Sequence, residues 1–177
     1  MPSGGMIKLS ENTAFVLSAI SSPSDRNFKV LYGRVRAKVD KLASKSSFNV
    51  HSDVATAGVR GTDFGYEVVT EKATGAEAQK PVTRVYCFDG AVVVAVTQPG
   101  VELPEEVLVK SGKMVKVEER EGVWVPELVP LPEDVRSFWK ANEFAASAAR
   151  KTAGEPSPTA AVSLPTYSQV QAGMKKK

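Results

Sequence analysis

The segment from Phe48 to Val68 constrains the fold more than any other part of the chain. From Phe48 to Val54 the residues of one parity are mostly apolar and alternate with polar ones, and the alternation resumes from Phe64 to Val68. A period of two is typical of a half-buried strand. Between the runs, 58–62 reads Gly-Val-Arg-Gly-Thr, and glycine permits positive φ or close backbone approach. The segment therefore predicts two strands that meet at a tight corner.

We expect this corner to be a structural element rather than a binding site. An arginine between glycines at a buried corner can donate several hydrogen bonds to loop carbonyls, and this is the role predicted for Arg60. The residues predicted to form the corner are Gly58, Arg60, Gly61, Thr62 and Phe64.

The remainder of the chain up to Val125 carries short apolar runs separated by turn-forming residues. A glycine precedes several of these runs in a similar way, as at Gly33, Gly90 and Gly112. Short strands at regular intervals are typical of a sandwich, a barrel or a solenoid. We therefore predict an all-β fold, a solenoid-like or two-sheet stack of short strands, followed by one C-terminal helix and a disordered tail.

The composition changes twice after the β region, and this predicts three segments. Residues 4–125 form the β domain, and residues 126–150 form a proline strap and an amphipathic helix that packs on it. Residues 151–177 are rich in Ala, Pro, Ser and Lys, which predicts disorder because little apolar surface can be buried. We expect Phe138 and Trp139 to cover the β core as a lid, although an exposed aromatic face for a partner is the alternative.

The charge of the chain is small in total but uneven along the sequence. A net charge of +3 does not indicate a nucleic-acid partner. Basic residues crowd 26–45 and glutamates crowd 102–121, which predicts two faces that complement each other within the fold. The alternative is a basic edge that docks an acidic partner, with Arg34, Arg36, Lys38 and Trp139 as the interaction residues.

Few residues could carry chemistry. His51 is the single histidine and the one candidate general base, and Cys87 lies in an apolar run that predicts a buried thiol. Asp63 and Glu67 share a strand parity and could bind a cation or act as an acid/base pair, but this spacing is weak evidence. We predict no catalytic, metal or cofactor site.

No apolar run is long enough for a membrane-spanning helix, since the longest, 91–96, has the length of a strand. The first six residues lack the features of a secretory signal. Because strand-like sequence begins at once, at Met6, we expect a mature fragment with an added initiator Met.

Several motifs in the same order resemble the FecR domain, over about Gly4 to Val125. The most specific is Val-Arg-Gly-Thr-Asp-Phe at 59–64; the others lie at 5–13, 33–39, 48–57, 89–94 and 111–117. The resemblance implies an all-β domain on the outer side of a cytoplasmic membrane. In the best-known members, FecR binds a sigma factor inside the cell and senses an outer-membrane transporter from the periplasm.

The chain looks most like stand-alone FecR-domain proteins, which implies a non-enzymatic interaction or scaffolding module of the bacterial envelope. It would bind a protein partner by strand addition or through the basic face, and self-association stays open. One alternative is peptidoglycan or carbohydrate binding with Tyr66, Trp124 or Trp139 as stacking platforms. Others are the periplasmic part of a sigma-factor regulator and, least favoured, a hydrolase that uses His51. The expected location is periplasmic or otherwise extracytoplasmic, with the signal peptide removed.

Overall fold

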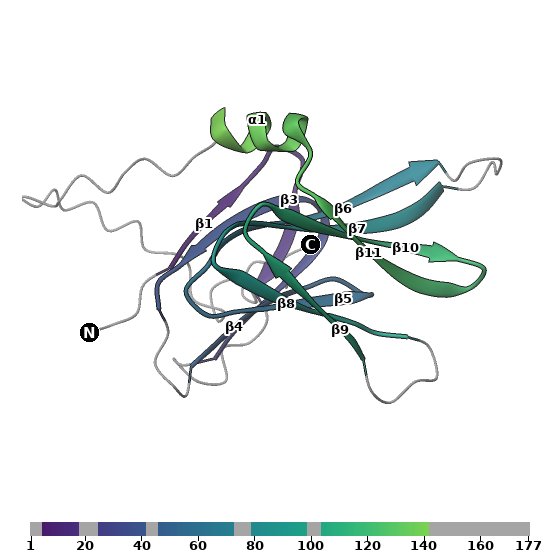
Figure 1. The fold of residues 1–177 in the computed structure, drawn as a ribbon, viewed down its shortest axis with the longest axis horizontal. Coiled ribbons are helices and arrows are strands. Elements are labelled where there is room, and N and C mark those ends of the chain that lie inside the picture. Colours follow the sequence, from purple (N-terminus) through teal and green to yellow (C-terminus); the bar gives the residue numbers. More distant parts are fainter. Residues whose placement is uncertain (1–4, 18–24, 42–45, 73–78, 99–103, 142–177) are drawn as a thin grey trace, which may run out of the picture. The chain divides into compact units, whose positions relative to one another are not determined.

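The computed structural model describes residues 5–17, 25–41, 46–72, 79–98 and 104–141 (Figure 1). The segment predicted to be a disordered tail, 151–177, and the end of the predicted helix lie outside these ranges.

Eleven strands and one helix make up this part of the chain, and they follow one another in sequence order. The strands are β1 (Gly5–Leu9), β2 (Ala14–Leu17), β3 (Asp25–Val39), β4 (Ser47–His51), β5 (Ala55–Val59), β6 (Asp63–Lys72), β7 (Gln79–Asp89), β8 (Ala91–Val96), β9 (Glu105–Lys110), β10 (Lys113–Arg120) and β11 (Val123–Pro130), and the helix is α1 (Glu133–Ala141).

All eleven strands belong to one sheet, whose path is β11-β10-β7-β6-β3-β4-β5-β8-β9. The C-terminal part of β3 pairs with β1 and β6, whereas its N-terminal part pairs with β2 and β4. Neighbours are antiparallel except β3 and β4. We call the half with β6, β7, β10 and β11 the helix-side half, and the half with β4, β5, β8 and β9 the opposite half.

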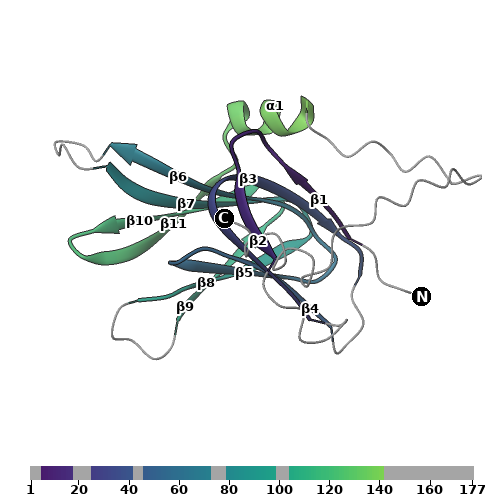
Figure 2. The ribbon, with the colours of Figure 1, turned by 180° about the vertical axis from the view of Figure 1, so that it is seen from behind.

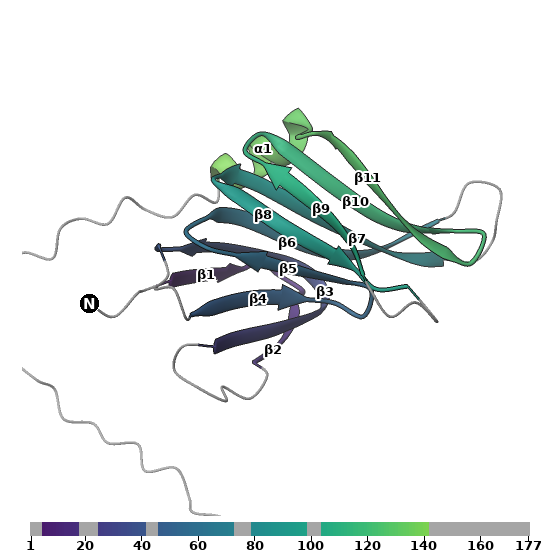
Figure 3. The ribbon, with the colours of Figure 1, turned by 60° about the horizontal axis from the view of Figure 1, so that its bottom comes forward.

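The sheet curves until its two ends meet, because β9 packs against β10 and β11 (Figures 2 and 3). The prediction of a β fold followed by one helix is confirmed. The expected solenoid-like or two-sheet stack is not: the strands form one continuous sheet that is nearly closed into a barrel. Sequence periodicity does not reveal pairing order, and the 15-residue β3, which runs through Gly33 without a break, joins the two halves.

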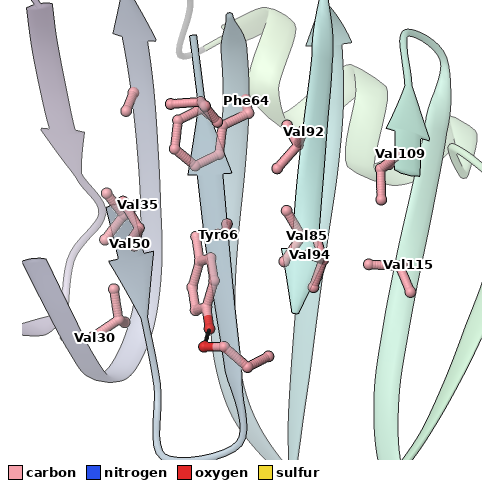
Figure 4. Packing of buried hydrophobic residues seen from close by; sticks show 14 of the residues in the cluster. Val30, Val35, Val50, Phe64, Tyr66, Val85, Val92, Val94, Val109 and Val115 are labelled. Carbon is pink, nitrogen blue, oxygen red and sulfur yellow. Dashed lines mark hydrogen bonds between the residues drawn. The ribbon is translucent and has the colours of Figure 1, made fainter. Parts of the chain in front are cut away.

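The core lies between the two halves and consists mostly of valine (Figure 4). Alternate residues of β3, β6, β7 and β10 point inward from the helix-side half, such as Val35, Phe64 and Val85, each no more than 1% exposed. Val50 and Val94 face them from the opposite half and are fully buried. This dry interior follows from the period of two, which places every second side chain of a strand on the same face.

The chain crosses from one half of the sheet to the other at glycines whose φ angles are positive, in the left-handed region. Gly33 lies within β3, and the other three separate β5 from β6, β7 from β8, and β9 from β10. Their φ angles are 97°, 78°, 85° and 77° for Gly33, Gly61, Gly90 and Gly112. The glycines that precede strands in the sequence therefore mark the bends of a single sheet.

Helix α1 covers the outer surface of the helix-side half and forms a second apolar cluster there. Tyr86, Met114 and Leu131 are its buried members. Strand β11 continues to Pro130, so strand pairing extends into the segment expected to be a proline strap. Within the described residues, no helix has the length and apolarity to cross a membrane.

Candidate functional site: the arginine and carboxylate face beneath helix α1

The corner between β5 and β6 is held by backbone contacts around Gly61 and Thr62. The amide of Val39 donates to the Thr62 carbonyl at 2.9 Å, and Thr62 Oγ1 donates to the Ala91 carbonyl at 3.0 Å. A Cβ on Gly90 would lie 3.1 Å from the Gly61 carbonyl oxygen. Two bends of the sheet thus touch each other at Gly90, and the positive φ of both Gly61 and Gly90 itself favours glycine.

Arg60 does not lie in the buried position that its predicted role assumed, and that role stays a prediction. Its side chain is exposed, and no hydrogen bond from it to another described residue is present. Gly58 also differs from the prediction, because it lies inside β5 and does not have the left-handed φ of Gly61. Phe64 is buried at 1% exposure, as a corner residue facing the core should be. The corner is therefore formed by glycine geometry and threonine hydrogen bonds, without the arginine.

Arg36 joins the outer surface of the sheet to the end of helix α1. Its Nε and Nη2 atoms donate to the two carboxylate oxygens of Asp63, each at 2.9 Å, and its Nη1 atom donates to the Trp139 carbonyl at 2.7 Å. The guanidinium also lies 4.6 Å from the centre of the Phe88 ring. Only 4% of Arg36 is exposed. Bidentate pairing and stacking are interactions that lysine could not reproduce.

Arg34, two residues before Arg36 on the same face of β3, makes a similar connection. Its Nε donates to Glu67 at 2.5 Å, and the guanidinium lies 4.8 Å from the centre of the Phe138 ring. Glu67, only 1% exposed, also accepts from Arg84 at 3.4 Å and from the Tyr86 hydroxyl. Burial, and then the Glu67 carboxylate, raise the pKa of Tyr86, so its hydroxyl stays protonated and donates.

The ion pairs continue across the sheet as alternating charges. Glu71 accepts from Arg84 and lies 3.5 Å from the Lys116 ammonium, and Lys116 in turn lies 2.5 Å from Glu118. Hydrogen bonds from Lys116 and Arg120 lower the pKa of Glu118. We call Arg34, Glu67, Arg84, Glu71, Lys116 and Glu118 the charge chain.

The helix rests on a bare patch of the sheet at Gly65. A Cβ there would lie 2.9 Å from Tyr86 Cδ2 and 3.5 Å from Trp139 Cε2. Trp139 is 2% exposed, and its ring packs edge-on against Phe88 at 6.1 Å between centroids and against Phe138 at 5.0 Å. The helix packs on the β domain as a lid, and Gly65 provides the space for it.

Between the start of helix α1 and the sheet lies a hollow of about 280 Å³. Its lining combines the charge chain with helix residues and comprises Arg34, Glu67, Arg84, Tyr86, Met114, Lys116, Pro132, Asp134 and Val135. The three cations that line it each have a carboxylate partner in the protein. The Tyr86 hydroxyl also donates to Glu67, so the polar groups of the lining are largely paired with one another.

The structure brings Arg34, Arg36 and Trp139 together beneath helix α1, but it does not leave them as an open basic surface. Arg34 and Arg36 are bound to carboxylates of β6, and Trp139 is buried. Only Lys38 of this set is exposed, and its role in binding stays a proposal. The arginines do find partners within the fold, but in Asp63 and Glu67 rather than in the glutamates of 102–121. Asp63 and Glu67 therefore hold arginines and do not act as a pair with each other.

The other predicted chemistry finds no support in the geometry. Tyr66 and Trp139 are 0% and 2% exposed, which leaves them no face for stacking a sugar, and Trp124 is partly buried against the core. Burial raises the pKa of the Cys87 thiol to about 11, and His51 lies on β4 of the other half of the sheet. In the described ranges, no group of three or more His, Cys, Asp or Glu residues could hold a metal ion.

A nearly closed, mostly antiparallel sheet with a docked C-terminal helix defines the structural class. The FecR protein family model matches residues 1–93, more than half of the sequence, and the chain belongs to the FecR family. A search of curated protein sequences finds no match.

Two crystal structures, at 1.65 and 2.50 Å, of a candidate anti-sigma factor from Parabacteroides distasonis ATCC 8503 have a similar fold. Each has a TM-score of 0.55 and 16% sequence identity, over 79% of this chain and 57% of that protein. The chain thus spans little more than half the length of the protein it matches, and the likeness shows the fold alone.

Proposed function

We propose that this chain is the extracytoplasmic, signal-transducing part of a FecR-type regulator of a sigma factor, and that it works by binding a protein. The observation that carries the proposal is the FecR match over 1–93. The fold shared with a candidate anti-sigma factor supports it. The stand-alone scaffolding role suggested by the sequence has less support, because neither comparison points to it.

The geometry favours binding over catalysis. On the outer face, Arg34 and Arg36 are engaged in ion pairs beneath helix α1, and the one histidine and the one cysteine lie on different halves of the sheet. A domain that transmits a signal needs a stable body, a surface for a partner and an element whose position can change. The sheet provides the body, and helix α1 is the element fastened by a small number of polar contacts.

A comparison of gene transcription with and without the protein tests the proposal. In the source organism, the region encoding residues 5–141 would be deleted in frame and the transcriptome compared with that of the parent strain. We expect altered transcription of a small set of genes that share one promoter type, restored by the intact gene. An unchanged transcriptome in the deletion strain, when the parent strain is shown to produce the intact protein, would refute the sigma-factor role. The stand-alone scaffolding role would then be the favoured interpretation.

The location is tested separately. Alkaline phosphatase folds to its active form only where disulfides form, that is, outside the reducing cytoplasm. Fusion of this enzyme after the natural C-terminus of the chromosomally encoded protein should give phosphatase activity. An inactive fusion of full length would contradict an extracytoplasmic location.

A further inference from the structure

Helix α1 is attached to the sheet mainly by side chains. The last backbone hydrogen bond to the sheet before the helix is made at Leu131, whose amide donates to the Gly112 carbonyl at 3.0 Å. Among the described residues, no backbone-to-backbone hydrogen bond joins α1 to a strand. In 133–140, only Trp139 is buried, whereas Val135 and Phe138 are partly buried. The attachment is therefore concentrated in one residue near the C-terminal end of the helix.

A helix of this length does not persist alone. Helix α1 has nine residues, and isolated helices shorter than about 12 residues are marginal in water. Glu133 and Asp134 in its first turn and Lys140 in its last turn favour the helix through its dipole, but exposed charges of this kind contribute little. The helical conformation therefore depends on contact with the sheet.

Arg36 supplies a partner that the end of the helix lacks. The carbonyls of the last four residues of an α-helix have no partner within the helix, and the Trp139 carbonyl is one of them. The Arg36 Nη1 atom donates to this carbonyl at 2.7 Å. A cation at this end also interacts favourably with the helix dipole. A residue of β3 thus caps the helix, so helix formation and docking depend on the same contact.

The surface beneath the helix is held in place by contacts within the sheet. Asp63 of β6 accepts from the Nε and Nη2 atoms of Arg36, and the ring of Phe88 of β7 lies against the guanidinium. The Tyr86 hydroxyl donates to Glu67 of β6. The main apolar core lies on the other face of these strands. Departure of the helix would therefore leave both the core and these contacts in place.

We propose that helix α1 is a latch that folds and docks in a single step, and that opens as one unit while the sheet stays folded. In the docked state Arg36 caps the helix, and Trp139 lies over Gly65. In the open state the helix unfolds, because it loses its cap and its buried side chain together. Opening uncovers Trp139, Tyr86 and Phe88, and exposed apolar surface is a mark of interaction sites. Only the use of this opening as a signal rests on the proposed function.

Fluorine NMR of the purified full chain tests the latch, because one of its two tryptophans lies in the helix and the other in the sheet. With fluorotryptophan incorporated, Trp124 and Trp139 each give a resonance, and Trp124→Phe assigns them. We expect the native Trp139 resonance to disappear at a lower urea concentration than the native Trp124 resonance, since separate units give separate transitions. Disappearance of both at the same concentration would overturn the proposal.

Arg36→Gln tests the cap. Because this substitution removes the cation at the Trp139 carbonyl, we expect the equilibrium constant for opening, obtained from the Trp139 transition, to rise at least tenfold. Arg120→Gln is the control, since Arg120 pairs with Glu118 and Glu127 of the sheet and has no bond to the described helix. It should change the constant less than twofold. Equal effects of the two substitutions would contradict the capping role.

Substitutions at Ser137 test whether folding and docking are one step. Ser137 is exposed in the middle of the helix, and proline at such a position breaks a helix. In Ser137→Pro we expect the Trp139 resonance at its unfolded position without urea and the Trp124 resonance at its native position. Ser137→Ala, which favours the helix, should keep both native. A native Trp139 resonance in Ser137→Pro would overturn the proposal, and so would loss of the native Trp124 resonance.

The latch and the proposed function can fail independently. Separate transitions of the two tryptophans, without any transcriptional effect of the deletion, would reject the regulatory role and keep the latch. Coincident transitions together with altered transcription would reject the latch and keep the regulatory role.

Discussion

The two faces of the helix-side half are made by alternate residues of the same strands, yet different kinds of interaction stabilise them. The inner face, with Val35, Phe64 and Val85, is apolar and excludes water. The outer face, with Arg36 and Glu67, is built from charge pairs and aromatic rings. Apolar packing is nondirectional and large, whereas ion pairs are directional and largely offset by desolvation. The inner face therefore sets the stability of the sheet, and the outer face determines where helix α1 sits.

The largest expected effect tests the inner face. Phe64→Ala removes a ring that is 1% exposed and lies edge-on to Phe48, with 6.3 Å between centroids. We expect the free energy of unfolding to fall by about 3–5 kcal/mol, the usual cost of a large cavity in a core. Urea unfolding followed by circular dichroism measures it. A loss below about 1 kcal/mol would mean that the inner face does not dominate stability.

A buried carboxylate of the outer face should matter less. Glu67→Gln removes the charge that faces Arg34, Arg84 and Tyr86. We expect a loss of about 2 kcal/mol, less than for a fully buried pair because both arginines reach solvent. Glu127→Gln is the matched control, since its pair with Arg120 is exposed, and it should change stability by less than about 0.5 kcal/mol. Equal effects of the two substitutions would contradict this ranking.

Two glycines inside strands distinguish a covered surface from an open one. Gly65→Ala would place a Cβ 2.9 Å from a ring carbon of Tyr86, under the helix. We expect a loss of about 1–2 kcal/mol and faster hydrogen exchange in α1. In Gly58→Ala the nearest atom, Asn49 Oδ1, is 3.4 Å away. That variant should be neutral or stabilised by up to about 1 kcal/mol, because alanine restricts the unfolded chain. The opposite order would show that the helix does not rest on Gly65.

Two arginines should respond differently to the same conservative change. Arg36→Lys loses the bidentate pair with Asp63 and the bond to the Trp139 carbonyl, so we expect a loss of about 1–2 kcal/mol. The exposed Arg60→Lys should leave the melting temperature unchanged, as surface substitutions usually do. A measurable loss at Arg60 would restore its predicted structural role.

The smallest expected effect lies on the opposite half. Burial, and then Lys29, lower the pKa of His51 below 6.5, although Asp53 partly opposes this. The unfolded chain therefore takes up a proton before the folded one does, and stability should fall as the pH drops from about 6.5 through the folded pKa. The difference in unfolding free energy between the parent and His51→Asn, measured from pH 7.5 to 5, reports this. A difference that does not vary with pH would rule it out.

Local sequence patterns predicted the strands well because alternation and glycine positions are local signals. The lid role of Trp139, the buried thiol of Cys87 and the bend at Gly61 are present in the structure for that reason. Which side chains meet across the sheet, in contrast, is not determined by neighbouring residues in the sequence. Nothing near Arg34 in the sequence indicates that it meets Glu67, or that Arg84 lies on the other side of the same carboxylate. Arg60 lies exposed beside the bend at Gly61, and no local signal in the sequence indicates this. The predicted segment boundaries at 125 and 150 stay predictions.

Helix α1 is fastened most firmly near its end, where Arg36 holds the Trp139 carbonyl two residues before Ala141. A mechanical pull on the chain at Ala141 would therefore load Arg36 early and reach β3, the strand that joins both halves of the sheet and carries the β1 and β2 edge. Because Lys8 of β1 lies opposite Arg36 in the sheet, tension at the end of the helix would reach β1 across one strand pairing, while the packed ring of Trp139 shares the load.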